Sequence, residues 1–221
     1  MNNSTAAVLL LTMPGCGHCA ASQQSLQQLL AEGVIASLEC IDISHHPEWA
    51  ERLAIRSVPY VLTGPFIFQG ERPLSEWRYW LDVVRSEKGM AIYFDHLFSA
   101  GQRQLVEQII RYQSVSIQAF ADLLADTQVG INSRLGVGAV LEELSGTAVT
   151  ADLVKPLGQL TQHEVALVRG DACYYLSLLG WPAEAVPYWQ RCLVDPDPEV
   201  VEIARECLEE LQNHDGVGAA R

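Results

Sequence analysis

The chain has 221 residues, of which 49% are hydrophobic and 19% charged, and this composition indicates a folded globular protein rather than a disordered one. Its formal net charge is −13, with 27 acidic residues against 14 Lys and Arg. Nucleic-acid binding depends on clustered basic residues that displace counterions, so this charge argues against a nucleic-acid partner.

The sequence predicts neither a membrane span nor a secretion signal. No stretch approaches the roughly 20 apolar residues that cross a bilayer, and no basic residue precedes the short apolar run 6–11. Six cysteines are also too few for a scaffold held together by disulfides. We therefore expect a cytoplasmic protein in which most cysteines are free thiols.

The first ninety residues carry the pattern of a small α/β unit. A short apolar run predicts a strand over residues 6–13, ended by Pro14-Gly15, and leucines at helical spacing follow up to Gly33. The remaining expected elements are a helix over 17–32, a strand over 34–44, a helix over 46–55, strands over 58–64 and 65–70, and a helix over 74–87. The order β-α-β-α-β-β-α predicts a mixed sheet with helices on its faces.

Two motifs stand at turns of this predicted sheet. Cys16-Gly17-His18-Cys19 lies where the first strand meets the first helix, and Ser57-Val58-Pro59-Tyr60 begins the third strand. Together with the element order, these motifs over residues 5–88 resemble the thioredoxin fold in its minimal, glutaredoxin-like form. The resemblance implies that Pro59 has a cis peptide bond and faces the cysteine pair. It also implies that the backbone of Val58 pairs with a bound peptide or glutathione.

The resemblance also implies a different role for each residue of the motif. Cys16 at a helix N-terminus has free N–H groups and the helix dipole to favour its thiolate, which is the nucleophile in disulfide exchange. Cys19, one turn further on, resolves the mixed disulfide. His18 stabilises the thiolate and therefore the reduced form. CGHC is the motif of protein disulfide isomerases, with potentials near about −180 mV, whereas thioredoxin lies near about −270 mV.

Other interpretations of the cysteine pair stay open. Zinc binding by Cys16 and Cys19 requires two further ligands, but no second CxxC exists and His45-His46 lacks ligand spacing, so we expect no metal. The thioredoxin-like unit could instead serve only for docking. "SVPY" also differs from the Thr-Val-Pro of glutaredoxins, and the turn after it lacks their Gly-Gly pair. Cys40 is expected in the core.

Residues 89–221 are predicted to be all-helical, with a domain boundary at 88/89. The segments 119–146, 153–180 and 185–211 each read as a helix, a polar turn and a second helix that ends in Leu-x-x-Leu. The third segment resembles a HEAT repeat, and residues 93–113 form one more predicted hairpin. Arg134 and Arg169 occupy equivalent repeat positions, which predicts a structural ladder of arginines.

We therefore expect an α/β thioredoxin-like domain (1–88) and an all-α, HEAT-like repeat domain (89–221). The expected function is dithiol–disulfide exchange on a protein substrate or thiol partner, through a redox-active Cys16–Cys19 disulfide and without a bound cofactor. Thioredoxin reductase or glutathione would supply electrons, and the repeats would bind a partner. The alternative is a redox-sensing adaptor whose thioredoxin fold is a docking module.

Overall fold

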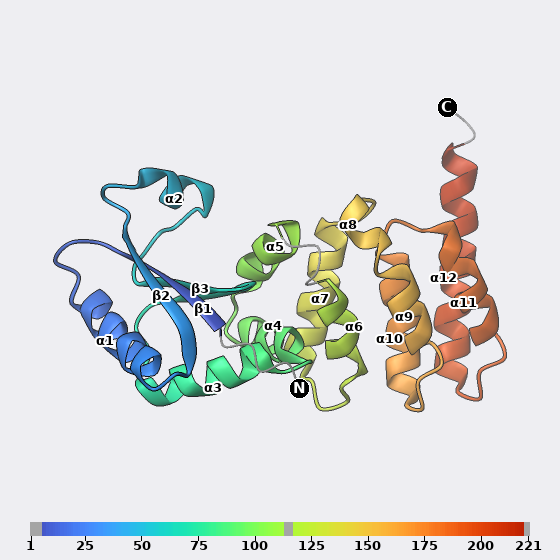
Figure 1. The fold of residues 1–221 in the computed structure, drawn as a ribbon. Helices are drawn as coiled ribbons and strands as arrows, with labels where there is room; N and C mark the ends of the chain where they lie inside the picture. Colours follow the sequence, from blue (N-terminus) through green and yellow to red (C-terminus); the bar gives the residue numbers. More distant parts are fainter. Residues whose placement is uncertain (1–5, 113–116, 219–221) are drawn as a thin grey trace. The chain divides into compact units, whose positions relative to one another are not determined.

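A computed structural model describes residues 6–112 and 117–218 of the chain. The protein is mixed α/β and separates into two compact units, Met1–Tyr93 and Phe94–Arg221 (Figure 1). The change from one unit to the other falls inside helix α4 (Gly89–Ser99), a few residues beyond the boundary expected from the sequence. None of the helices in the described parts of the chain has an apolar stretch long enough to cross a membrane.

The first unit contains the seven elements that the sequence predicts, in the predicted order. They are β1 (Ala6–Thr12), α1 (Gly17–Ala31), β2 (Ile35–Asp42), α2 (Pro47–Arg52), β3 (Tyr60–Thr63), β4 (Phe66–Gln69) and α3 (Leu74–Arg85). The strands form one sheet in the order β2-β1-β3-β4, in which β1 runs parallel to β2 while β3 is antiparallel to both β1 and β4. Strand β1 is therefore central, and the turn that follows it lies at the middle of one end of the sheet.

Burial of β1 and of one face of each long helix holds this unit together. Leu10 and Leu11 of β1 are fully buried, as are Leu26 and Leu29 of α1. Helices α1 and α3 contact each other and the sheet, while α2 lies apart from them across the sheet (Figure 1). The third leucine of α1, Leu30, is exposed, because it lies one residue beyond the buried stripe. The long helix that follows the CxxC turn is thus fixed on the sheet by its leucines.

The second unit consists of successive helical hairpins. Its helices after α4 are α5 (Arg103–Tyr112), α6 (Gln118–Ala125), α7 (Ile131–Glu143), α8 (Ala148–Ala151), α9 (Val154–Leu160), α10 (Ala166–Ser177), the short 3₁₀ turn η2 (Ala183–Ala185), α11 (Val186–Cys192) and α12 (Pro198–Gly218). Each predicted pair is present as α6/α7, α9/α10 and α11/α12. Helix α10 contacts α6, α9 and α12, so neighbouring hairpins pack directly on one another (Figure 1). The predicted hairpin 93–113 corresponds to α4 and α5, and residue 113 lies outside the described residues.

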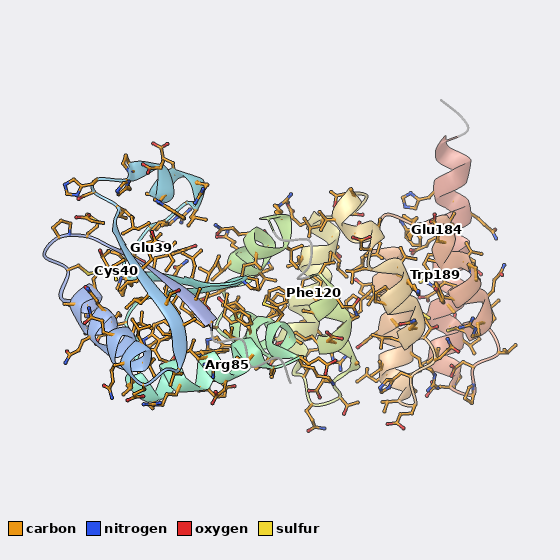
Figure 2. The ribbon with its side chains drawn as sticks, in the orientation of Figure 1. Glu39, Cys40, Arg85, Phe120, Glu184 and Trp189 are labelled. Atoms are coloured by element: carbon orange, nitrogen blue, oxygen red, sulfur yellow. A yellow bond between two sulfur atoms is a disulfide. The ribbon has the colours of Figure 1, made fainter. Side chains whose placement is uncertain are left out.

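The leucines that define the repeat lie in the core of this unit. Leu141, Leu144, Leu176 and Leu179 are all buried, whereas the corresponding Leu208 and Leu211 of α12 are half-buried. Phe120 on α6 and Trp189 on α11 are completely buried (Figure 2). The repeat seen in the sequence is therefore a repeat of core positions.

Arg134 and Arg169 connect successive hairpins, as their equivalent positions predict. The guanidinium of Arg134 donates to the carbonyl of Asp126, in the turn of its own hairpin, and forms an ion pair with Asp171 on α10. Arg169 repeats the arrangement one hairpin later, with the carbonyl of His163 in its own turn and the carboxylate of Asp195 in the next. Each arginine thus fastens one turn and links two hairpins.

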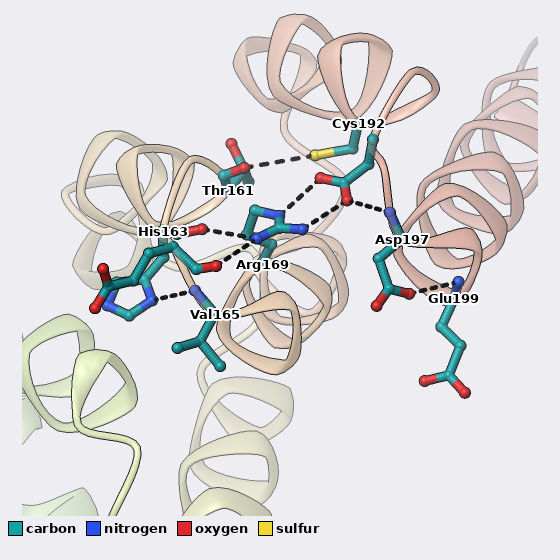
Figure 3. Close-up of polar contacts among 9 residues, drawn as sticks. Thr161, His163, Val165, Arg169, Cys192, Asp197 and Glu199 are labelled. Atoms are coloured by element: carbon teal, nitrogen blue, oxygen red, sulfur yellow. Dashed lines mark hydrogen bonds and ion pairs between the residues drawn. The ribbon is translucent and has the colours of Figure 1, made fainter.

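The Arg169 contacts are the more extensive of the two (Figure 3). Its Nε and Nη2 donate to the two carboxylate oxygens of Asp195 at 2.7 Å each, and Nη1 donates to the carbonyls of His163 and Glu164 at 2.9 and 3.1 Å. Asp195 also accepts the backbone amide of Asp197, which begins the turn into α12. The Arg169 hydrogen bonds hold the pKa of the Asp195 carboxyl below its ordinary value.

Candidate active site

Cys16 lies at the point where β1 turns into α1. Gly15 has a φ of 75°, a left-handed conformation that favours glycine, and this residue makes the tight turn from the strand. The amide of Cys16 donates to the carbonyl of Met13, and Cys16 itself is the N-cap residue of α1. Cys16 is partly exposed and lines an open hollow at the surface.

Cys19, one turn into α1, is the inner partner of the pair. It is bonded to Cys16 in a disulfide with a Cα–Cα separation of 5.2 Å, and it is only 3% exposed. The backbone amide of Cys19 donates to Cys16 Sγ at 3.1 Å. When the disulfide is reduced, this amide and the positive end of the 15-residue helix stabilise negative charge on Cys16. The two cysteines therefore differ in both access and electrostatics.

The Val58–Pro59 peptide bond is cis, as the resemblance implied. Pro59 is buried, and its carbonyl accepts the amide of Gly70 at 2.9 Å. Strand β3 begins at the next residue, Tyr60, which pairs with Leu11 near the end of β1. Strand pairing thus brings the Val58–Pro59 segment to the same end of the sheet as the cysteine turn.

A groove of about 560 Å³ joins the two motifs. Its lining residues are His18, Ser57, Val58, Pro59, Gly70, Glu71 and Pro73. A second hollow of about 360 Å³ includes Cys16 and Cys19 in its lining. The structure therefore brings His18 of the first predicted motif together with Val58 and Pro59 of the second.

Glu71 belongs to this groove but was missed in the sequence. Its Oε2 lies 2.6 Å from Nδ1 of His18, and the two side chains are 43% and 77% exposed. Glu71 precedes α3 by three residues in a polar loop, where a carboxylate is unremarkable in sequence. Only the contact with His18, 53 positions earlier, makes it part of the site.

Arg72 holds the loop that carries Glu71. Its Nη1 donates to the carbonyl of Gln69 at 2.9 Å, and its guanidinium lies over the rings of Phe68 and Trp77 at 5.1 and 5.8 Å from their centroids. The guanidinium of Arg72 also forms an ion pair of 2.9 Å with Glu76. The Glu71 wall of the groove is thereby attached to the aromatic core.

No family model matches this chain, and a search of curated proteins finds no similar sequence.

The three cysteines of the second unit, Cys173, Cys192 and Cys207, are all buried. A hydrogen bond with Cys192, together with burial, raises the pKa of Cys173, and the same hydrogen bond lowers the pKa of Cys192. Burial and the nearby Glu210 raise the pKa of Cys207 to about 12. Cys192 is 2% exposed, so a substrate disulfide cannot reach it. The Cys207 thiol donates to the carbonyl of Cys173, an internal contact between α12 and α10. These three residues are packing groups of the second unit.

The expectation that Cys40 lies in the core is wrong. Cys40 is exposed on β2 beside Glu39 (Figure 2), because β2 is an edge strand in which only Ile35 is fully buried. Partial burial and the charge of Glu39 raise the pKa of its thiol, which disfavours the thiolate. Among the residues with described positions, no group of three or more His, Cys, Asp or Glu side chains could hold a metal ion.

Proposed function

We propose that the protein is a thiol–disulfide oxidoreductase that exchanges disulfides with protein substrates. In this proposal the first unit is thioredoxin-like and the second is a HEAT-like repeat array that binds a partner. The observation that carries it is the asymmetry of the cysteine pair: a partly exposed Cys16 at a helix N-terminus, bonded to a buried Cys19, next to a groove that contains a cis-proline.

The exchange proceeds in two balanced steps. The Cys16 thiolate of the reduced protein attacks one sulfur of the substrate disulfide, so that a Cys16–substrate bond forms and the other substrate sulfur leaves as a thiolate. The thiolate of Cys19 then attacks Cys16 Sγ, the Cys16–Cys19 disulfide forms, and the second substrate sulfur leaves. Two electrons pass to the substrate, and the reverse sequence oxidises a dithiol.

The groove supports substrate binding beside Cys16. Within the described residues, neither the amide nor the carbonyl of Val58 has a hydrogen-bond partner, and Val58 is only half-buried. An extended substrate chain could pair with this backbone and add to the end of the sheet. His18 lines the same groove and would stabilise the reduced form of Cys16.

We assign the electron supply to thioredoxin reductase or to glutathione, and we propose a cytoplasmic location. Four of the six cysteines are free thiols, which is the state that a reducing compartment maintains.

The second candidate function is a redox-sensing adaptor. It is favoured by large apolar side chains that the second helices of the hairpins expose. Ile131 and Leu135 on α7 are 67% and 65% exposed, and Leu167 on α10 is 57% exposed. Exposed apolar residues of this size are suited to contact with another protein.

The reduction potential of the Cys16–Cys19 pair tests the proposal. The protein would be equilibrated in glutathione buffers, quenched in acid and alkylated, and the modified thiols counted by mass. A reversible two-electron transition between about −270 and −180 mV is expected. Cys16→Ser should abolish disulfide reduction of insulin, while Cys40→Ser, a matched control on an exposed cysteine, should leave it unchanged. Full activity of Cys16→Ser, or the absence of a Cys16–Cys19 disulfide, would favour the adaptor.

A further inference from the structure

We propose that Glu71 makes the groove beside the cysteine pair selective for protein disulfides that carry a Lys or Arg next to the reacting cysteine. The same carboxylate disfavours glutathione disulfide. This inference rests on the proposed exchange activity and names the substrate class of that site.

Glu71 is the only acidic residue among those that line the groove. The other lining residues are His18, Ser57, Val58, Pro59, Gly70 and Pro73, of which only His18 can ionise, and an imidazole is charged only when protonated. Glu71 is 43% exposed, so its carboxylate is open to a bound molecule. A substrate in this groove therefore meets a negative charge.

No Lys or Arg within residues 6–93 forms an ion pair with Glu71 in the structure. Over residues 6–93, its one ion pair in the structure is with His18, through Oε2. The adjacent Arg72 forms an ion pair with Glu76, and its Nη1 donates to the carbonyls of Gln69 and Gly70. Glu71 Oε1 thus remains able to accept a hydrogen bond from a cationic side chain of the substrate.

The groove also places Glu71 close to the substrate residues that flank the cysteine. A chain paired with the backbone of Val58 lies in the groove that Glu71 and His18 line, and His18 is within the CxxC motif. We expect a Lys or Arg one or two positions from the reacting cysteine of that chain to reach Glu71. Glutathione disulfide has four carboxylates and two ammonium groups, so its net charge is repelled by the same residue.

Three peptide disulfides that are identical except for Lys, Gln or Glu beside the cysteine test this inference. The measurement is kcat/KM for their reduction by the dithiol form of the full chain, at low and at high salt. An exposed ion pair contributes up to about fivefold, so attraction of the Lys peptide and repulsion of the Glu peptide together predict a preference of about tenfold. High salt should reduce this preference. Glutathione disulfide should react more slowly than the Gln peptide.

Glu71→Gln should bring the three peptides within about twofold of one another and speed the reaction with glutathione disulfide. Glu51→Gln is the matched control, because Glu51 is exposed on α2 and outside the groove lining, and it should keep the wild-type preference.

The outcomes separate this inference from the proposed function. Equal rates for the three peptides with the wild-type protein, or a preference that survives Glu71→Gln, overturn the inference while exchange activity stands. An equal change in kcat/KM for all three peptides in Glu71→Gln, together with a shifted Cys16–Cys19 reduction potential, also overturns the inference. Glu71 would then be a positioning residue for His18. Absence of turnover even with the Gln peptide refutes the exchange activity itself.

Discussion

Replacing Arg169 by Met should strongly destabilise the second unit. The side chains of Arg169 and Asp195 are only 11% and 7% exposed, and the guanidinium donates four hydrogen bonds of 2.7 to 3.1 Å. Methionine keeps most of the volume but leaves the Asp195 carboxylate and two carbonyls without these donors. Removal of one partner of a buried ion pair costs about 3–5 kcal/mol. For a chain of this size the loss corresponds to a decrease in Tm of about 10–15 °C.

The assay is urea unfolding followed by circular dichroism and tryptophan fluorescence, in which the buried Trp189 reports on the same hairpin. Asp195→Asn and the double variant complete a mutant cycle. The double variant should be more stable than the sum of the two single losses predicts, because no isolated charge is left behind. Arg205→Met is the control, since Arg205 and its partner Glu202 are 49% and 59% exposed, and it should change stability by at most about 1 kcal/mol.

A loss below about 1 kcal/mol in Arg169→Met, equal to that of the Arg205 control, would refute the reasoning. The Arg169 contacts would then contribute no more to stability than an exposed ion pair, and the two hairpins would be held together by apolar packing alone.

Three further predictions concern stability. The Arg169 hydrogen bonds lower the pKa of Asp195 in the folded protein, so the ionised carboxylate stabilises the fold above about pH 4. This contribution is lost as the pH falls through the pKa of Asp195 in the folded protein. The urea midpoint should therefore fall less between pH 7 and pH 3 in Asp195→Asn than in wild type. Gly158→Ala would place a Cβ 2.3 to 2.6 Å from ring atoms of Tyr188 and should lower stability by about 1–3 kcal/mol in calorimetry, with partial rescue by Tyr188→Ala. Leu26→Ala removes a completely buried side chain of the first unit and should lower its unfolding free energy by about 2–5 kcal/mol in urea titration, whereas a loss below 1 kcal/mol would contradict the described packing.

The order of elements was predictable because it depends on local signals. Apolar runs, helical spacing of leucines and the Pro14-Gly15 and Gly33 turns each act over a few residues, and they specified all seven elements of the first unit. The cis bond before Pro59 came from the resemblance to the thioredoxin fold, and it is present. The equivalent spacing of Arg134 and Arg169 likewise predicted the ladder.

The remaining features depend on contacts between distant segments. Cys40 is exposed because β2 is an edge strand. The hydrophobic periodicity of a single strand does not predict the order of strands in a sheet. The contact of Glu71 with His18 requires the β3–β4 hairpin to return beside the CxxC turn. The acidic partners of the arginines, Asp171 and Asp195, do not occupy equivalent positions of their repeats, so the sequence repeat did not reveal them.

The attachment of the Glu71 loop by Arg72 has a consequence for the entropy of binding. A loop that becomes ordered only around its ligand loses conformational freedom at that moment, and this loss reduces affinity. Here the guanidinium stacked on Phe68 and Trp77 and bonded to Gln69 has already fixed the loop during folding. In the proposed exchange, a substrate chain would therefore bind against a loop that is already ordered, and its binding would not include the entropic cost of ordering that loop.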